Sequence, residues 1–225
     1  MGSVPSEMYL GAFESKLRAI QAATLDISFL DRLCSSDNVI AMDQSTRIIP
    51  TLQTDRLILR PFNQADAKRV QLLAGHSDVA ATTANLPHPY SDGAAEGWIS
   101  MQQPAFEKLS GLVLAIELKT SNELVGCVSL MGISQPDSKA EVGYWIGLDY
   151  WNKGYCSEAV SKIFDYAFDE LALNKITSRH MKINQSSGRV MIKCGMKHEG
   201  TLRQEFRKNG IFHDLEVYGL LKSER

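Results

Sequence analysis

Apolar positions change their spacing along the chain, and each spacing predicts a kind of element. In residues 1–50 they recur every three or four positions, as at Leu10, Phe13 and Leu17, which indicates two short amphipathic helices. From Thr51 onward, short apolar runs alternate with longer helical patterns, which is typical of an α/β domain. We therefore expect an N-terminal helical extension over 1–50 that packs on the domain or on a partner, and one domain over 51–225.

The second part of the chain contains the predicted strands. The last two are joined around Asn209-Gly210, a strong hairpin signal, and the second and third by the polar turn Thr120-Ser121-Asn122. Both connections favour antiparallel pairing. The strands are expected over 57–59, 112–117, 124–130, 141–148, 175–183, 198–207 and 213–221.

Helices are predicted between these strands. Asn63 is a candidate N-cap, with Asp66 three residues later supporting the first turn. A second helix is expected to start at Ser91-Asp92 and to be kinked or ended by Pro104. A third follows Gly154 and carries one apolar stripe, and a short one spans 187–193.

A polar turn with one glycine joins a strand to a helix at 151–160 (WNKGYCSEAV). The start of a helix leaves several amide N–H groups unpaired and carries partial positive charge, so a phosphate can bind there. Gly154 gives the phosphate access and can adopt a positive φ, while Lys153 adds charge. The turn lacks the further glycines of P-loop and dinucleotide patterns. Taken alone, it is equally consistent with a glycine that only packs a helix on a sheet.

Four separated stretches resemble the GNAT acetyltransferase superfamily, and within it the RimJ/RimL type of ribosomal-protein N-terminal acetyltransferases. They are TDRLILRPF (54–62), AEVGYWIGLDYWNKGYCSEAV (140–160), NQSSGRVMIKCGMKHEG (184–200) and NGIFHDLEVYGLL (209–221). The resemblance covers about residues 51–221 and depends on the order of the matches more than on any single one. It implies a mixed α/β fold whose mostly antiparallel, six- to seven-stranded sheet splays at its centre and is flanked by about four helices.

The resemblance also implies acetyl-CoA as the acyl donor. Its pyrophosphate is expected at the glycine turn, and its pantetheine arm along the preceding strand end and near Asn184. The expected cofactor-binding residues are Trp145, Ile146, Gly147, Asn152, Lys153, Gly154, Tyr155, Cys156, Ser157 and Asn184. The turn departs from the family pattern at Trp151, where glutamine or arginine is common, and at Cys156, where glycine or alanine is common. We interpret Cys156 as a small buried filler.

Acyl transfer to an amine needs a base, because the amine must be neutral to attack, and the leaving thiolate can use an acid. Glu141 is the first candidate for the base, since in the family a glutamate on this strand often acts through water. Glu205, on a later strand, is the second candidate. By resemblance, Ser187 is the candidate acid, although Ser186 or Ser187 can equally be a helix N-cap.

The acceptor is expected to be a primary amine, either a protein N-terminus or a small molecule. His88 and Tyr90, in a proline-rich loop, are candidates to line its pocket together with Glu205. Two other readings remain open at this point. The chain could be a non-catalytic acyl-CoA sensor or scaffold, or it could transfer another acyl group such as succinyl.

Composition narrows the class of protein. A net charge of −2 gives no reason to expect nucleic acid or an anionic membrane as partner. The chain shows neither an apolar run of membrane-spanning length nor a signal core. Cys34, Cys127, Cys156 and Cys194 match no zinc or CxxC spacing, so we expect no metal and reduced thiols in a cytoplasmic protein. The N-terminal helices make a homodimer possible.

Overall fold

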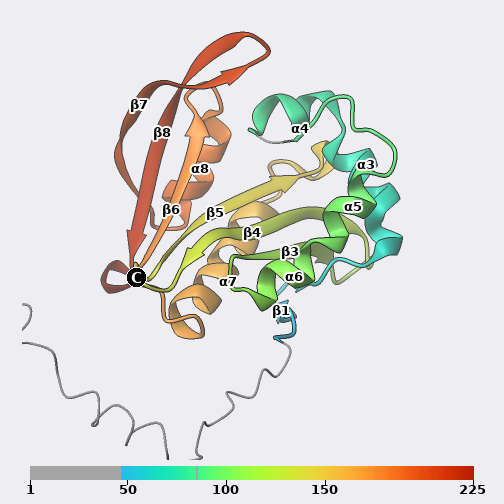
Figure 1. Cartoon of the computed structure of the whole chain (residues 1–225), viewed down its shortest axis with the longest axis horizontal. Helices are drawn as coiled ribbons and strands as arrows, with labels where there is room; N and C mark the ends of the chain where they lie inside the picture. Colours follow the sequence, from blue (N-terminus) through green and yellow to red (C-terminus); the bar gives the residue numbers. More distant parts are fainter. Residues whose placement is uncertain (1–46, 85) are drawn as a thin grey trace, which may run out of the picture. The chain divides into compact units, whose positions relative to one another are not determined.

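The computed structural model describes residues 47–84 and 86–225 (Figure 1). The helices predicted within residues 1–46 lie outside the described part. Ile49 is buried in the main hydrophobic core, and Arg47 donates a hydrogen bond to the carbonyl of Glu107. The folded domain therefore includes at least four residues before Thr51.

Eight strands form one sheet in the order β1-β2-β3-β4-β5-β6-β8-β7. All neighbours are antiparallel except β5 and β6, which are parallel. The predicted fold class is confirmed, with β1 as the strand that the sequence did not indicate, because two residues are too few for a spacing pattern. The strands are β1 (Leu52–Gln53), β2 (Leu57–Arg60), β3 (Gly111–Leu118), β4 (Leu124–Ser134), β5 (Lys139–Ile146), β6 (Lys175–Met181), β7 (Lys197–Lys208) and β8 (Ile211–Leu221).

Six α-helices and three 3-10 turns lie within the described residues. The α-helices are α3 (Ala67–Ala74), α4 (Ser77–Thr82), α5 (Ala94–Ser100), α6 (Gln102–Glu107), α7 (Tyr155–Asp169) and α8 (Gln185–Lys193), and the turns are η1 (Gln64–Asp66), η2 (Leu148–Tyr150) and η3 (Lys222–Glu224). The expectation that Pro104 ends a helix was wrong. The break falls at Met101, and Pro104 lies in the first turn of α6, where its missing N–H removes no helical bond.

The two faces of the sheet are covered by different helices (Figure 1). Alternate side chains of a strand point to opposite faces. On β4 and β5, Val128 and Val142 enter the core that contains α7, whereas Cys127 and Trp145 enter the core that contains α3 and α5. The face toward which a β5 side chain points therefore follows from its position in the strand.

The sheet splays at its centre, as predicted. β5 pairs with β6 only over Lys139–Glu141, opposite residues 175–177, although β5 remains paired with β4 as far as Ile146. Just past the last pair, the Ser178 hydroxyl donates to the carbonyl of Val142 at 3.0 Å. Beyond this bridge the two strands separate, and we call the opening between them the fork.

Asp66 links the first helix to the sheet. Arg60 of β2 donates to both Asp66 carboxylate oxygens, at 2.8 and 2.9 Å, and to Glu117 of β3 at 2.6 Å. Burial alone would raise the pKa of Asp66. The hydrogen bonds from Arg60 and from the Asn63 amide outweigh burial and hold this pKa below its ordinary value.

We expect Asp66→Asn to lower the free energy of unfolding by about 2 kcal/mol at neutral pH, since hydrogen bonds to a charged group contribute about that much. Because the folded-state pKa is depressed, the contribution is complete above the unfolded-state carboxyl pKa and is lost as pH falls through the folded-state pKa. Urea unfolding of both proteins at neutral and at acidic pH measures this. A stability gap of the same size at both pH values would contradict it.

Candidate active site

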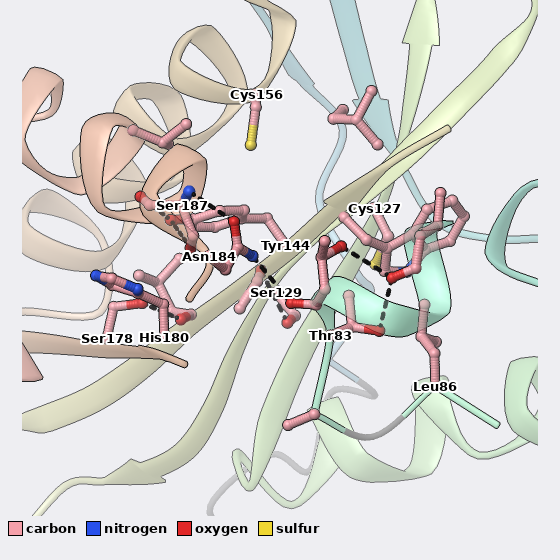
Figure 2. A pocket seen from close by; sticks show the side chains of 18 of the residues that line it. Thr83, Leu86, Cys127, Ser129, Tyr144, Cys156, Ser178, His180, Asn184 and Ser187 are labelled. Atoms are coloured by element: carbon pink, nitrogen blue, oxygen red, sulfur yellow. Dashed lines mark hydrogen bonds between the residues drawn. The ribbon is translucent and has the colours of Figure 1, made fainter. Parts of the chain in front are cut away.

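A cavity of about 1150 Å³ lies around the fork (Figure 2). It extends from the turn before α7, past the start of α8, to the face of the sheet covered by α3, α4 and α5. Most of the residues singled out from the sequence line it, which brings together segments far apart in the chain. They are Tyr90, Glu141, Trp145, Ile146, Asn152, Gly154, Tyr155, Cys156, Ser157, Asn184, Ser187 and Glu205. His88, Gly147 and Lys153 are not among the lining residues.

The turn at one end of the cavity has the geometry of an anion cradle. Asn152 and Gly154 adopt positive φ values of 61° and 80°, and Gly154 is the N-cap of the 15-residue helix α7. The first helical bond runs from the Glu158 amide to the Gly154 carbonyl, so the amides of the three preceding residues have no partner within the helix. A Cβ added at Gly154 would meet only the tip of Arg56, at 3.3 Å. The cradle is therefore open to a phosphate group, and it fits the pyrophosphate of coenzyme A.

Arg56, the residue just before β2, holds this turn in place. Its guanidinium donates to the Lys153 carbonyl at 3.0 Å and to Glu158 at 2.7 Å, and it lies over the Tyr155 ring at 4.7 Å. Burial would raise the pKa of Glu158, but bonds from Thr54 and Arg56 lower it below its ordinary value. The Glu158 carboxylate thus stays charged and fixes Arg56. No local pattern indicated this pairing, because the two residues are 102 positions apart.

Backbone groups of β5 face the fork on alternate residues. The Val142 carbonyl points toward β6, where it accepts from Ser178, so the main-chain groups of Tyr144 and Ile146 point the same way. Trp145, named from the sequence, is paired with Cys127 of β4. The Trp151 indole N–H donates to the Ile146 carbonyl at 2.7 Å. Trp151, which departs from the family pattern, therefore occupies one main-chain carbonyl that faces the fork.

Three side chains meet at the start of α8 (Figure 2). Asn184 is the N-cap, and its side chain accepts from the Ser187 amide at 3.2 Å and donates to the Thr82 carbonyl at 2.9 Å. Ser187 is thus not the cap, and its hydroxyl is 3.0 Å from the Tyr144 hydroxyl. Burial raises the pKa of Tyr144 far above its ordinary value, so its phenol stays protonated. Sequence reasoning missed Tyr144, although strand alternation within 140–146 places it on the face of β5 toward α8.

Glu141 lies on the opposite face of the sheet from Tyr144. It shares the face of Trp145, toward α3 and α5, and its carboxylate is bound by both ends of the Arg179 guanidinium, at 3.1 and 3.0 Å. Arg179 was not identified from the sequence. Glu141 and Ser187 therefore flank the fork from opposite faces of the sheet.

Charge is unevenly distributed along the cavity. Arg189 and Lys193 of α8 line it, and α8 packs against α7, whose N-terminus forms the cradle. Burial raises the pKa of the Cys156 thiol well above its ordinary value, although the residue also lines the cavity. At the other end, Tyr90 is half-buried and Glu205 is exposed. His88 is exposed, and its Nδ1 lies 3.1 Å from the Gly75 carbonyl.

Residues 47–84 and 86–225 contain no group of three or more histidine, cysteine or acidic side chains that could hold a metal ion. No helix in this part of the chain is long and apolar enough to cross a membrane.

Comparisons with known proteins agree on one family. The family model described as "Acetyltransferase (GNAT) domain" matches residues 56–197. "Uncharacterized N-acetyltransferase YoaA" of Bacillus subtilis is 31% identical over 78% of this chain and 98% of its own. "Putative ribosomal N-acetyltransferase YdaF" of the same organism is 40% identical over 45% of this chain and 55% of its own. A structure of RimL with coenzyme A superposes with a TM-score of 0.71 over 80% of this chain and all of RimL, at 18% identity, which shows the shared fold.

Proposed function

We propose that this chain, which belongs to the GNAT acetyltransferase family and uses acetyl-CoA, is of the RimJ/RimL type and acetylates a primary amine. The amine attacks the thioester directly in a ternary complex. The amine is the N-terminus of a protein or belongs to a small molecule. The name of YdaF describes it as a putative ribosomal N-acetyltransferase, which supports a protein N-terminus as one of the two alternatives. The observation that carries the proposal is the fork, with a carboxylate on one face of the sheet and a hydroxyl pair on the other.

The chain's own groups can hold the acyl donor along the cavity. The free amides of Tyr155, Cys156 and Ser157 would donate to the pyrophosphate, helped by the partial positive charge of α7. The fork-facing main chain of Tyr144 and Ile146, with Asn184 nearby, would pair with the pantetheine amides. Acetyl-CoA supplies the acetyl group as an activated thioester. The protein's contribution is to hold that thioester at the fork, within reach of both faces.

Glu141 and Ser187 divide the proton transfers between them. On the acceptor face, Glu141 would accept the proton of the attacking amine, directly or through a water molecule. The Arg179 guanidinium orients this carboxylate by binding both of its oxygens. On the other face, Ser187 would donate a proton to the departing sulfur, with its hydroxyl oriented by Tyr144. Glu205 remains the alternative base, because it also lines the cavity.

Transfer of a dicarboxylic acyl group such as succinyl has less support. It needs a free cation near the acyl end. Among the described residues of the cavity, Arg179 is bound by Glu141 at both ends of its guanidinium, and Arg189 and Lys193 lie on α8, which packs against α7.

The test is a screen of amines and N-terminal peptides with acetyl-CoA, read by thiol release and by the mass shift of the acceptor. An acceptor that gains one acetyl group per thiol released supports the proposal. Coenzyme binding measured by calorimetry, with no thiol release on any acceptor, would make the chain an acyl-CoA sensor and sink the proposal.

Ser187→Ala is expected to lower kcat by about 10²-fold, the lower end of what a general acid contributes, because the Tyr144 hydroxyl stays in place. The KM for acetyl-CoA should change little, since Asn184 still caps α8. Tyr144→Phe is the matched variant, which removes the orienting hydroxyl alone and should cost less. A larger loss in Tyr144→Phe than in Ser187→Ala would assign the acid to the tyrosine.

A further inference from the structure

The acceptor end of the cavity is nearly free of charged side chains. This end lies between α3–α5 and the face of β4 and β5 that carries Ser129, Met131 and Trp145. Among the described residues that line it, the acidic groups are Glu141, which Arg179 binds, and Glu205, which is exposed on β7. The apolar and aromatic lining comes from both sides and consists of Val70, Val79, Leu86, Tyr90, Trp98 and Val113.

Three hydroxyls in this wall are bound to nearby backbone. The hydroxyls of Thr82 and Thr83 donate to the Val79 carbonyl at 3.0 and 3.1 Å, and Ser129 donates to Gly143 at 3.2 Å. Figure 2 shows Thr83, Leu86 and Cys127 across the cavity from Tyr144, Asn184 and Ser187. A ligand on this side therefore meets mainly carbon atoms and hydroxyls that already have partners.

The wall is also tied in position across the cavity. Carbonyls at the C-terminal end of α4 accept hydrogen bonds from two distant elements. Asn184, the N-cap of α8, donates to the Thr82 carbonyl. Lys208 of β7 donates to the carbonyls of Ala80 and Thr83. Burial lowers the pKa of Lys208. Because the Lys208 ammonium is bound to these carbonyls, it does not supply a free cation for an acidic acceptor.

From this lining we propose that the acceptor is a monoamine borne by an apolar aliphatic or aromatic group, and that the pocket under α3–α5 binds this group. The inference rests on the proposed amine acetylation and narrows its substrate class. A polyamine would have to place its second ammonium against apolar side chains, which is unfavourable for an unpaired charge, or pair it with Glu205, an exposed carboxylate whose ion pairs are weakened by water. A free amine and a peptide whose first side chain is apolar present the same chemistry.

A matched pair of probes tests the proposal on the wild-type protein. Pentylamine and 1,5-diaminopentane differ by one ammonium group, and we expect kcat/KM for pentylamine to be higher by at least about tenfold. 2-Phenylethylamine should be acetylated as well as pentylamine, and spermidine as poorly as the diamine. Peptides that begin with phenylalanine, compared with peptides that begin with lysine, distinguish a protein acceptor from a free amine. Equal or faster turnover of the diamine or spermidine would overturn the proposal.

A charge placed in the wall should change this preference. Leu86 lines the cavity from a loop and is half-buried, so a longer polar side chain fits there without entering a tightly packed core. In Leu86→Glu the ratio of kcat/KM for pentylamine over the diamine should fall by about tenfold or more. Leu86→Gln, which has the same length without the charge, should keep the wild-type order. Turnover of pentylamine by both variants shows that they are folded.

Binding separates failure of this inference from failure of the proposed function. Calorimetry of the same amines with the protein and coenzyme A needs no turnover. Tighter binding of pentylamine than of the diamine without thiol release would sink the enzymatic proposal and keep the pocket assignment. Equal binding, or binding of neither amine, would overturn the pocket assignment itself.

Discussion

Replacing Glu141 by glutamine is expected to lower kcat by about 10²- to 10⁴-fold, the range that a positioned general base contributes. The change keeps the shape of the side chain and removes its ability to accept a proton. Activity that remains should rise steadily with pH, because the amine must then lose its proton without help. Steady-state kinetics over a range of pH values, with a single amine acceptor, measure both effects.

Glu205→Gln is the matched control, because it neutralises the other acidic side chain in the cavity. Glu205 is exposed on β7, whereas Glu141 lies next to the fork and is held by Arg179. We expect Glu205→Gln to keep kcat within a few-fold of wild type. A large loss of kcat in Glu205→Gln together with a mild effect in Glu141→Gln would reverse the assignment of the base.

The elements that the sequence predicted well are those with a strong local pattern. The hairpin at Asn209-Gly210 and the helix after Gly154 both carry their own turn chemistry and apolar spacing. β1 and α4 were missed, since two and six residues give no spacing pattern and are stabilised by the elements they contact. Pro104 was misread because a proline fits the first turn of a helix as well as the position after its end.

The sequence predicted which segments form the candidate site, but not which side chains in them bind one another. The glycine turn and the NQSS stretch could be located by resemblance and by the chemistry of a helix start. The bonds of Arg56 with Glu158 and of Arg179 with Glu141 join positions 102 and 38 apart, and no local pattern specifies such a partner. Nor could the sequence separate the faces of the sheet until the pairing of β4 with β5 was known. That pairing puts Glu141 and Ser187 on opposite faces.

Gly154→Ala is expected to raise the KM and the Kd for acetyl-CoA by about 10- to 100-fold, because a hydrogen bond to a charged group contributes about 1.5–3 kcal/mol and the cradle would lose at least one. Two causes act together. The residue has a φ of 80°, which disfavours any side chain, and its Cβ would lie 3.3 Å from the Arg56 guanidinium that holds the turn in place. The value of kcat at saturating acetyl-CoA should change much less, since Glu141 and Ser187 are untouched.

Gly93→Ala separates strain from lost phosphate binding. Gly93 is the N-cap of α5 and has a φ of 79°, nearly the same as Gly154, but a Cβ there meets no atom within 4 Å. Both variants should therefore lose similar stability in urea unfolding, about 1–2 kcal/mol for one strained residue. Only Gly154→Ala should bind acetyl-CoA more weakly in calorimetry. If both variants lost affinity equally, backbone strain would account for the effect, and the turn before α7 would be a packing turn with no part in binding the coenzyme.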